Sequence, residues 1–169
     1  MSDGPSSFRS RVPIAVLALF GCAVSTYLAL FQYGVLSSVW DPFFGDGSRA
    51  VLTSAVSRML PVSDAALGAG AYLVEAVLEL SGGSRRWHDR PWLVLLVGLT
   101  AAAFAVTGVG LVITQPVLTG TFCTLCITSA VISWVVALLV SREVRAALGR
   151  VRELRRNGLP LSASLAGRA

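Results

Sequence analysis

Residues 91–118 read PWLVLLVGLTAAAFAVTGVGLVITQPVL and contain no charged side chain. Because about 20 apolar residues suffice for a helix to cross a bilayer, this stretch predicts a membrane span. Three further apolar runs flank it in the sequence, two before it at residues 13–36 and 65–80 and one after it at 123–140. The run at 65–80 is the weakest, because it contains Glu75 and Glu79. The pattern predicts an all-α, polytopic membrane protein built as a bundle of four transmembrane helices.

The composition of the 169-residue chain agrees with this prediction, since 54% of its residues are apolar and 14% are charged. A soluble domain carries about 25% charged residues, so the composition argues against a soluble globule and against a disordered tail. We expect a membrane domain at 12–142 between two tails, at 1–11 and 143–169, with no second domain. The first apolar run is too long for a cleaved signal peptide.

The basic residues, all fourteen of them arginine, predict how the chain is oriented. Twelve of them lie before the first span, between the second and third spans, or after the fourth. Cytoplasmic loops are enriched in arginine and lysine, so this distribution places both tails and the middle loop in the cytoplasm. The loop at 37–63 then lies on the outer face. The arginine excess of the C-terminal tail suits an anionic inner leaflet rather than a nucleic acid.

The outer loop contains a helical pattern of its own. Asp46, Gly47 and Ser48 indicate a turn that leads into a helix. Apolar residues then recur with helical spacing as far as Pro61, at Val51, Leu52, Ala55, Val56, Met59 and Leu60. This spacing predicts a short amphipathic helix on the outer membrane surface, and a surface loop with chance periodicity is the alternative. Residues 143–156 also have helical spacing and predict an extension of the fourth span.

The candidate for chemistry is the sequence Cys123-Thr124-Leu125-Cys126 at the start of the fourth span. This C-x-x-C spacing lets two thiols on one helical turn form a disulfide, and a helix N-terminus favours the reactive thiolate. On the predicted topology the pair faces an oxidising compartment. The position suits exchange with a protein dithiol on one side and with a lipid-soluble electron carrier on the other.

Two other interpretations of the cysteine pair are weaker. A metal site needs two or more further ligands, but Cys22 is predicted in mid-membrane and His88 on the cytoplasmic side. We therefore predict no metal. A purely structural disulfide within one helical turn would restrain almost none of the chain. Cys22 itself is interpreted as a small apolar packing residue.

Residues 122–129, FCTLCITS, resemble the catalytic motif of the vitamin K epoxide reductase family. The family's loop serine, its proline, and the glycine and tyrosine of its second helix are matched in order by Ser54, Pro61, Gly68 and Tyr72. The resemblance covers about residues 12–142. It implies a four-helix membrane oxidoreductase of the bacterial inner membrane. Bacterial members pass electrons from a thioredoxin-like protein to a quinone, either menaquinone or ubiquinone, and so drive disulfide formation.

The resemblance also implies what individual residues do. Cys126 would face the quinone, and Cys123 would exchange with the incoming dithiol. The quinone-binding residues would be Ser54, Asp64 and Tyr72. Asp64 falls where the family often has an asparagine that hydrogen-bonds a quinone oxygen, and a protonated carboxyl would make the same bond. The alternative is that Ser63 and Asp64 cap the second helix.

Two departures from the family's pattern affect the expected mechanism. The family has two loop cysteines that relay electrons to the C-x-x-C pair, but the second falls at Ser48 here and the first near Trp40 or Asp41. An internal relay is therefore excluded, so either a partner reacts directly with Cys123 or the protein does not perform the relay. The family's tyrosine four residues after the second cysteine is Ala130 here, so one quinone hydrogen bond is missing.

Two functions from other classes stay open. A redox-inactive membrane subunit or adaptor would keep the fold without the relay, and it would tolerate loss of both cysteines. A small-molecule or ion carrier would use Asp64 and Glu75, since ionisable groups within a span are usually functional or paired. Glu75 would alternatively feed protons to the quinone, whereas Glu79 is expected to reach the cytoplasmic interface.

Overall fold

The structure is a computed structural model that describes residues 6–55, 57 and 62–167. The described residues form helices joined by turns, and no strand occurs among them. The helices in chain order are α1 (Phe8–Gln32), α2 (Gly47–Leu52), α3 (Asp64–Leu80), α4 (Arg86–Asp89), α5 (Pro91–Thr119), α6 (Thr124–Arg156) and α7 (Leu161–Leu165). The prediction of an all-α protein is therefore confirmed for the part of the chain that is described.

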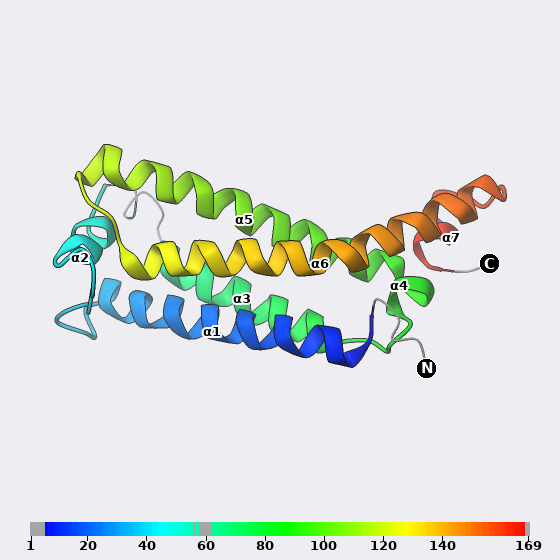
Figure 1. The fold of residues 1–169 in the computed structure, drawn as a ribbon, viewed down its shortest axis with the longest axis horizontal. Helices are drawn as coiled ribbons and strands as arrows, with labels where there is room; N and C mark the ends of the chain where they lie inside the picture. The colour runs from blue at the N-terminus through cyan, green and yellow to red at the C-terminus, as the bar shows by residue number, and fades with distance from the viewer. Residues whose placement is uncertain (1–5, 56, 58–61, 168–169) are drawn as a thin grey trace.

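The four long helices lie lengthwise along one bundle (Figure 1). α1 packs mainly against α3, and α5 packs mainly against α6, while α6 also contacts α1. The short helix α2 covers one end of the bundle, and α4 and α7 lie at the other end. Small and branched side chains fill the centre, among them the fully buried Ala18, Val97 and Val136.

Three of these helices, α1, α5 and α6, are long and apolar enough to cross a membrane. α3 has 17 residues, and the buried carboxylic acids Glu75 and Glu79 lie within it. The prediction of four transmembrane helices is thus supported for three of them, and the crossing by α3 stays a prediction. α6 runs without a break for 33 residues, which confirms that the segment at 143–156 extends the fourth predicted span.

The described part of the outer loop differs from the amphipathic helix predicted between Val51 and Pro61. Helix α2 begins earlier, at Gly47, and ends at Leu52, and residues 53–55 form turns and a bend. Four residues on which the prediction depended, Val56, Met59, Leu60 and Pro61, lie outside the described part. The amphipathic helix is therefore not confirmed.

Glycines allow close approaches that position the elements around the site. A Cβ added at Gly47 would lie 2.1 Å from the carbonyl oxygen of Phe122, so α2 sits directly on the turn between α5 and α6. A Cβ added at Gly21 in α1 would lie 2.7 Å from the ring of Tyr72 in α3. Small residues at helix interfaces let backbones approach closely, which is how α1 accommodates this aromatic ring.

A buried ion cluster joins α3, α4 and α6 at the end opposite to α2. The guanidinium of Arg86 lies 2.7 Å from Glu79 and 2.6 Å from Glu143, and all three side chains are at least 96% buried. It also donates to the carbonyl oxygens of Leu78, Glu79 and Ser81. Burial lowers the pKa of Arg86, but the two carboxylates outweigh this effect and raise it above its ordinary value. The expectation that Glu79 reaches the interface was wrong, because Arg86 is available as a partner inside the bundle.

Replacing Arg86 with methionine is expected to destabilise the fold by about 3–5 kcal/mol, because two carboxylates then stay buried without their partner. The matched control is Arg150→Met, which breaks an ion pair with the exposed Glu153 and is expected to cost about 1 kcal/mol or less. Unfolding of the purified variants in mixed micelles by increasing denaturing detergent measures both effects. Equal losses in the two variants would contradict the importance given to the buried cluster.

Candidate functional site

The two cysteines form a disulfide at the first turn of α6, at the end of the bundle that α2 covers. Cys123 is the N-cap residue, and its Sγ accepts a hydrogen bond from the backbone N–H of Cys126 at 3.1 Å. The two Cα atoms are 5.2 Å apart, within the usual range for a disulfide. The pair therefore lies where free N–H groups and the helix dipole favour a thiolate after reduction.

The turn before α6 is held by an amide from α5. Gly120 ends α5 in the left-handed conformation, with φ of 66°. The buried side chain of Gln115, one turn earlier, accepts the N–H of Cys123 with its Oε1 at 2.9 Å. Sequence reasoning missed this residue, although the signal was present, since Gln115 is the single side-chain amide in the apolar stretch 91–118.

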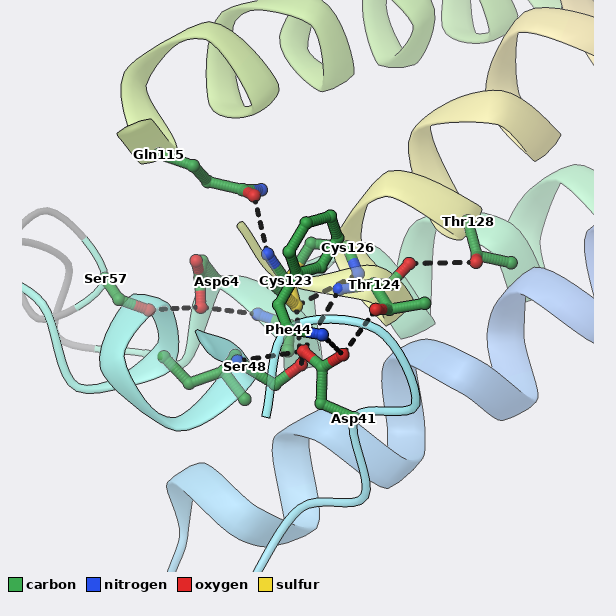
Figure 2. Close-up of a disulfide and its surroundings, with 12 residues drawn as sticks. Asp41, Phe44, Ser48, Ser57, Asp64, Gln115, Cys123, Thr124, Cys126 and Thr128 are labelled. Carbon is green, nitrogen blue, oxygen red and sulfur yellow. Dashed lines mark hydrogen bonds between the residues drawn. A yellow bond between two sulfur atoms is a disulfide. The ribbon is translucent and has the colours of Figure 1, made fainter. Parts of the chain in front are cut away.

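Asp41 joins the outer loop to the start of α6 (Figure 2). Its Oδ1 accepts the amides of Phe43 and Phe44 and the hydroxyl of Thr124. Its Oδ2 accepts the N–H of Thr124 at 3.3 Å and the N–H and hydroxyl of Ser48 at 3.1 and 2.7 Å. Burial raises the pKa of Asp41, but these hydrogen bonds outweigh it and hold the pKa well below its ordinary value. The carboxylate is therefore ionised at neutral pH.

Ser48 connects this carboxylate to the disulfide. Its hydroxyl oxygen lies 2.7 Å from Asp41 Oδ2 and 3.2 Å from Cys123 Sγ, and the residue is fully buried. The sequence prediction placed the family's absent loop cysteines at Ser48 and near Trp40 or Asp41. The structure brings Asp41 and Ser48 together and places both beside the disulfide.

A partly open cavity of about 360 Å³ lies beside Cys126 and does not include Cys123 in its wall. Cys126 lines it together with Asp64 and Tyr72 from α3. Most of its wall is apolar, as with Leu28 and Phe104, and its size is typical of a small-molecule site. Three of the residues predicted from sequence to form the site thus border one cavity.

Ser54 borders a smaller neighbouring cavity, of about 50 Å³, together with Asp64 and Cys126. Asp64 Oδ1 accepts hydrogen bonds from Gln32 at 2.6 Å and from Ser57 at 2.9 Å. It also accepts the N–H of Ala65, while Ser63 caps α3 through the N–H of Ala66. Ser63 is thus the capping residue of α3, Asp64 lies in the first turn and lines both cavities, and its binding to a quinone stays a prediction.

The polar groups at the base of the larger cavity come from α3 and α6. The hydroxyl of Tyr72 donates to the carbonyl oxygen of Ser129 at 2.6 Å and lies 2.7 Å from the hydroxyl of Ser133. The hydroxyl oxygen of Ser129 is buried and has no hydrogen-bond partner among the described residues. Ala130, where the resembling family has a tyrosine, lines the cavity beside it.

The remaining candidates lie away from the disulfide. Glu75 is buried in α3, and its Oε1 has no hydrogen-bond partner among the described residues. Cys22 is half-buried and packs against the core, which agrees with its interpretation as a packing residue. Within the described part of the chain, no group of three or more His, Cys, Asp or Glu side chains could hold a metal ion.

The fold and site define a class: a helical membrane protein with a cysteine pair between the end of the bundle that α2 covers and an apolar cavity. The model of the vitamin K epoxide reductase family matches residues 12–141, and the chain belongs to this family. No curated protein and no solved structure matches the chain. Family membership suggests a membrane oxidoreductase that acts on thiols and disulfides.

Asparagine in place of Asp41 is expected to make the protein less stable at about pH 7. Because the folded pKa lies below the ordinary value near 4, Asp41 stabilises the fold above about pH 4 and loses this effect as the pH falls further. The difference in the free energy of unfolding between wild type and Asp41→Asn should therefore be constant down to about pH 4 and should become smaller below it.

Unfolding midpoints in detergent across this pH range measure the effect of Asp41→Asn. Asp46→Asn is the control, since Asp46 lies in the same loop and its side chain makes no capping hydrogen bond to α2. That variant is expected to stay close to wild type at neutral pH. A stability difference for Asp41→Asn that grows in acid would contradict the assignment.

Proposed function

We propose that the protein is a quinone-dependent thiol–disulfide oxidoreductase. It passes two electrons from the dithiol of an extracytoplasmic thioredoxin-like protein to a membrane quinone. The observation that carries this proposal is the position of Cys126 in the wall of an apolar cavity. Its partner Cys123 is the N-cap of the same helix and lies against Ser48 of α2, outside that cavity. The disulfide thereby separates a side suited to a lipid-soluble substrate from the side that carries the outer loop.

The first half-reaction is thiol–disulfide exchange at Cys123. A thiolate of the partner attacks Cys123 Sγ, a mixed disulfide forms, and the bond to Cys126 breaks so that Cys126 leaves as a thiolate. The partner's second thiol, as its thiolate, then attacks the partner's own sulfur and releases Cys123. The partner is oxidised by two electrons, and the Cys123–Cys126 disulfide is reduced.

In the second half-reaction the cysteine pair is reoxidised and the quinone takes up two electrons and two protons. Cys126 is the sulfur that contacts the quinone, and Ser54, Asp64 and Tyr72 bind it. The free hydroxyl of Ser129 offers a further donor at the base of the cavity. Hydrogen-bond donors aimed at an oxygen that gains negative charge, together with the dipole of α6, stabilise the reduced ring.

The same proposal assigns the orientation of the chain. α3 crosses the membrane as a fourth span, with its two buried carboxylic acids shielded by α1, α5 and α6. Both tails lie in the cytoplasm of a bacterium, the protein lies in its inner membrane, and the disulfide lies at the outer face. The quinone is menaquinone or ubiquinone, and the size and apolar lining of the cavity support a ring of this kind.

Replacing Cys126 with alanine is expected to abolish turnover, because the electrons have no other sulfur at the cavity. The assay supplies a reduced thioredoxin-fold dithiol to the purified protein in detergent and follows quinone reduction by absorbance. Cys123→Ala should be equally inactive, and Cys22→Ala is the control that should keep wild-type activity. Absence of turnover in the wild type with several quinones and dithiols would refute the proposal and favour the redox-inactive adaptor.

Asp64→Asn tests the quinone contact at the start of α3. An asparagine keeps an oxygen that accepts from Gln32 and Ser57 and adds an N–H donor for a quinone oxygen. Because the residue at position 64 makes the same bond in both cases, we expect Asp64→Asn to keep a KM for quinone within about twofold of wild type. Asp64→Ala should raise this KM by about fivefold, the worth of one hydrogen bond. Equal KM values in the two variants would show that residue 64 makes no bond to the quinone.

A further inference from the structure

The two sulfurs of the disulfide differ completely in access. Cys126 lines both cavities, whereas Cys123 is 0% exposed. The sulfur of Cys123 is covered by the hydroxyl of Ser48 at 3.2 Å, and Gly47 brings α2 against the backbone of Phe122. An incoming dithiol therefore cannot touch Cys123 while the outer loop has this arrangement.

Asp41 holds this cover in place. Its carboxylate binds the loop that precedes α2 through two amides, α2 through both polar groups of Ser48, and α6 through both polar groups of Thr124 (Figure 2). Hydrogen bonds to an ionised group are about twice as strong as those between neutral groups. The contacts to Thr124 are the ones that tie the loop to the helix carrying the disulfide.

The hydrogen of Ser48 also limits the reactivity of Cys123. A hydroxyl has a single proton to donate, so Ser48 cannot donate to Asp41 and to Cys123 together. The carboxylate is the nearer and the charged acceptor, at 2.7 Å against 3.2 Å for the sulfur. In the closed arrangement, Ser48 thus covers Cys123 without offering its proton to a leaving thiolate.

We propose that Asp41 is a positioning residue that gates thiol exchange at Cys123. It keeps Ser48 and α2 on the sulfur, and an outer dithiol reacts only after the hydrogen bonds from Thr124 to Asp41 break and the loop opens. The inference rests on the proposed function, in which Cys123 is the exchanging sulfur. It adds that the loop residues standing in place of the relay cysteines control access instead of carrying electrons.

The test measures alkylation of each cysteine separately. The full-length Cys22→Ala protein in detergent is reduced and treated for increasing times with N-ethylmaleimide, which is small and enters both water and apolar cavities. Peptide mass spectrometry then quantifies the alkylation of each cysteine. Cys123 is expected to react at least about tenfold more slowly than Cys126. Asp41→Asn should accelerate Cys123 by about tenfold, the effect of losing one charge-assisted hydrogen bond, and should leave Cys126 within about twofold.

Thr124 supplies a matched pair of variants in case Asp41→Asn fails to fold. Thr124→Val removes the hydroxyl that binds Asp41 at nearly constant shape and should also accelerate Cys123, whereas Thr124→Ser keeps the hydroxyl and should behave as wild type. A variant that merely unfolds would accelerate both cysteines together. Rapid alkylation of Cys123 in the wild type, or unchanged rates in folded Asp41→Asn and Thr124→Val, would overturn the proposal.

The alkylation test needs neither quinone nor partner protein. Slow alkylation of Cys123 with no quinone turnover would refute the proposed function and keep the gate. Quinone turnover with a freely reactive Cys123 would refute the gate and keep the function.

Discussion

The buried positive charge of Arg86 lies where α3, α4 and α6 meet. A buried charge is tolerated only when oppositely charged groups and hydrogen bonds surround it, and here two carboxylates and three carbonyl oxygens do so. The carbonyl oxygens belong to Leu78 and Glu79 in the last turn of α3 and to its C-cap Ser81, the region where a helix leaves carbonyl groups without full partners. One side chain thus satisfies a helix end and fixes α6 against it, and the relative position of the helices follows from this contact.

Asp41 has the corresponding place at the other end of the bundle. It collects backbone N–H groups of the outer loop and of the first turn of α6, which also have no partner within a helix. Arg86 thus fixes one end of the bundle and the half-buried carboxylate of Asp41 fixes the other, and the core between them is built mainly from apolar side chains. The cavity beside Cys126 is lined by residues of α1, α3, α5 and α6, and Gly108 and Ala130 are among the small residues of its wall.

Local patterns predicted the long helices, because apolar runs and the C-x-x-C spacing are properties of neighbouring residues. They did not predict the partners of Arg86 or Asp41. Glu143 is 57 positions from Arg86, and Thr124 is 83 positions from Asp41, so only the packed fold brings them together. The outer helix was predicted from Val51 onward, yet α2 begins at Gly47 because the missing side chain of that glycine lets the backbone rest on Phe122.

Full burial of Cys123 lowers the rate at which thiols in solution attack the disulfide. The rate at which a disulfide is attacked depends on access to its sulfur as well as on the attacking thiolate. On the proposed topology, a small thiol in the outer solution meets the buried side of Cys123, whereas a lipid-soluble molecule in the cavity would contact Cys126 directly. On this topology Cys123 faces the aqueous side and Cys126 faces the apolar side. Thiols other than the partner protein would then reduce the disulfide only as often as the cover over Cys123 opens.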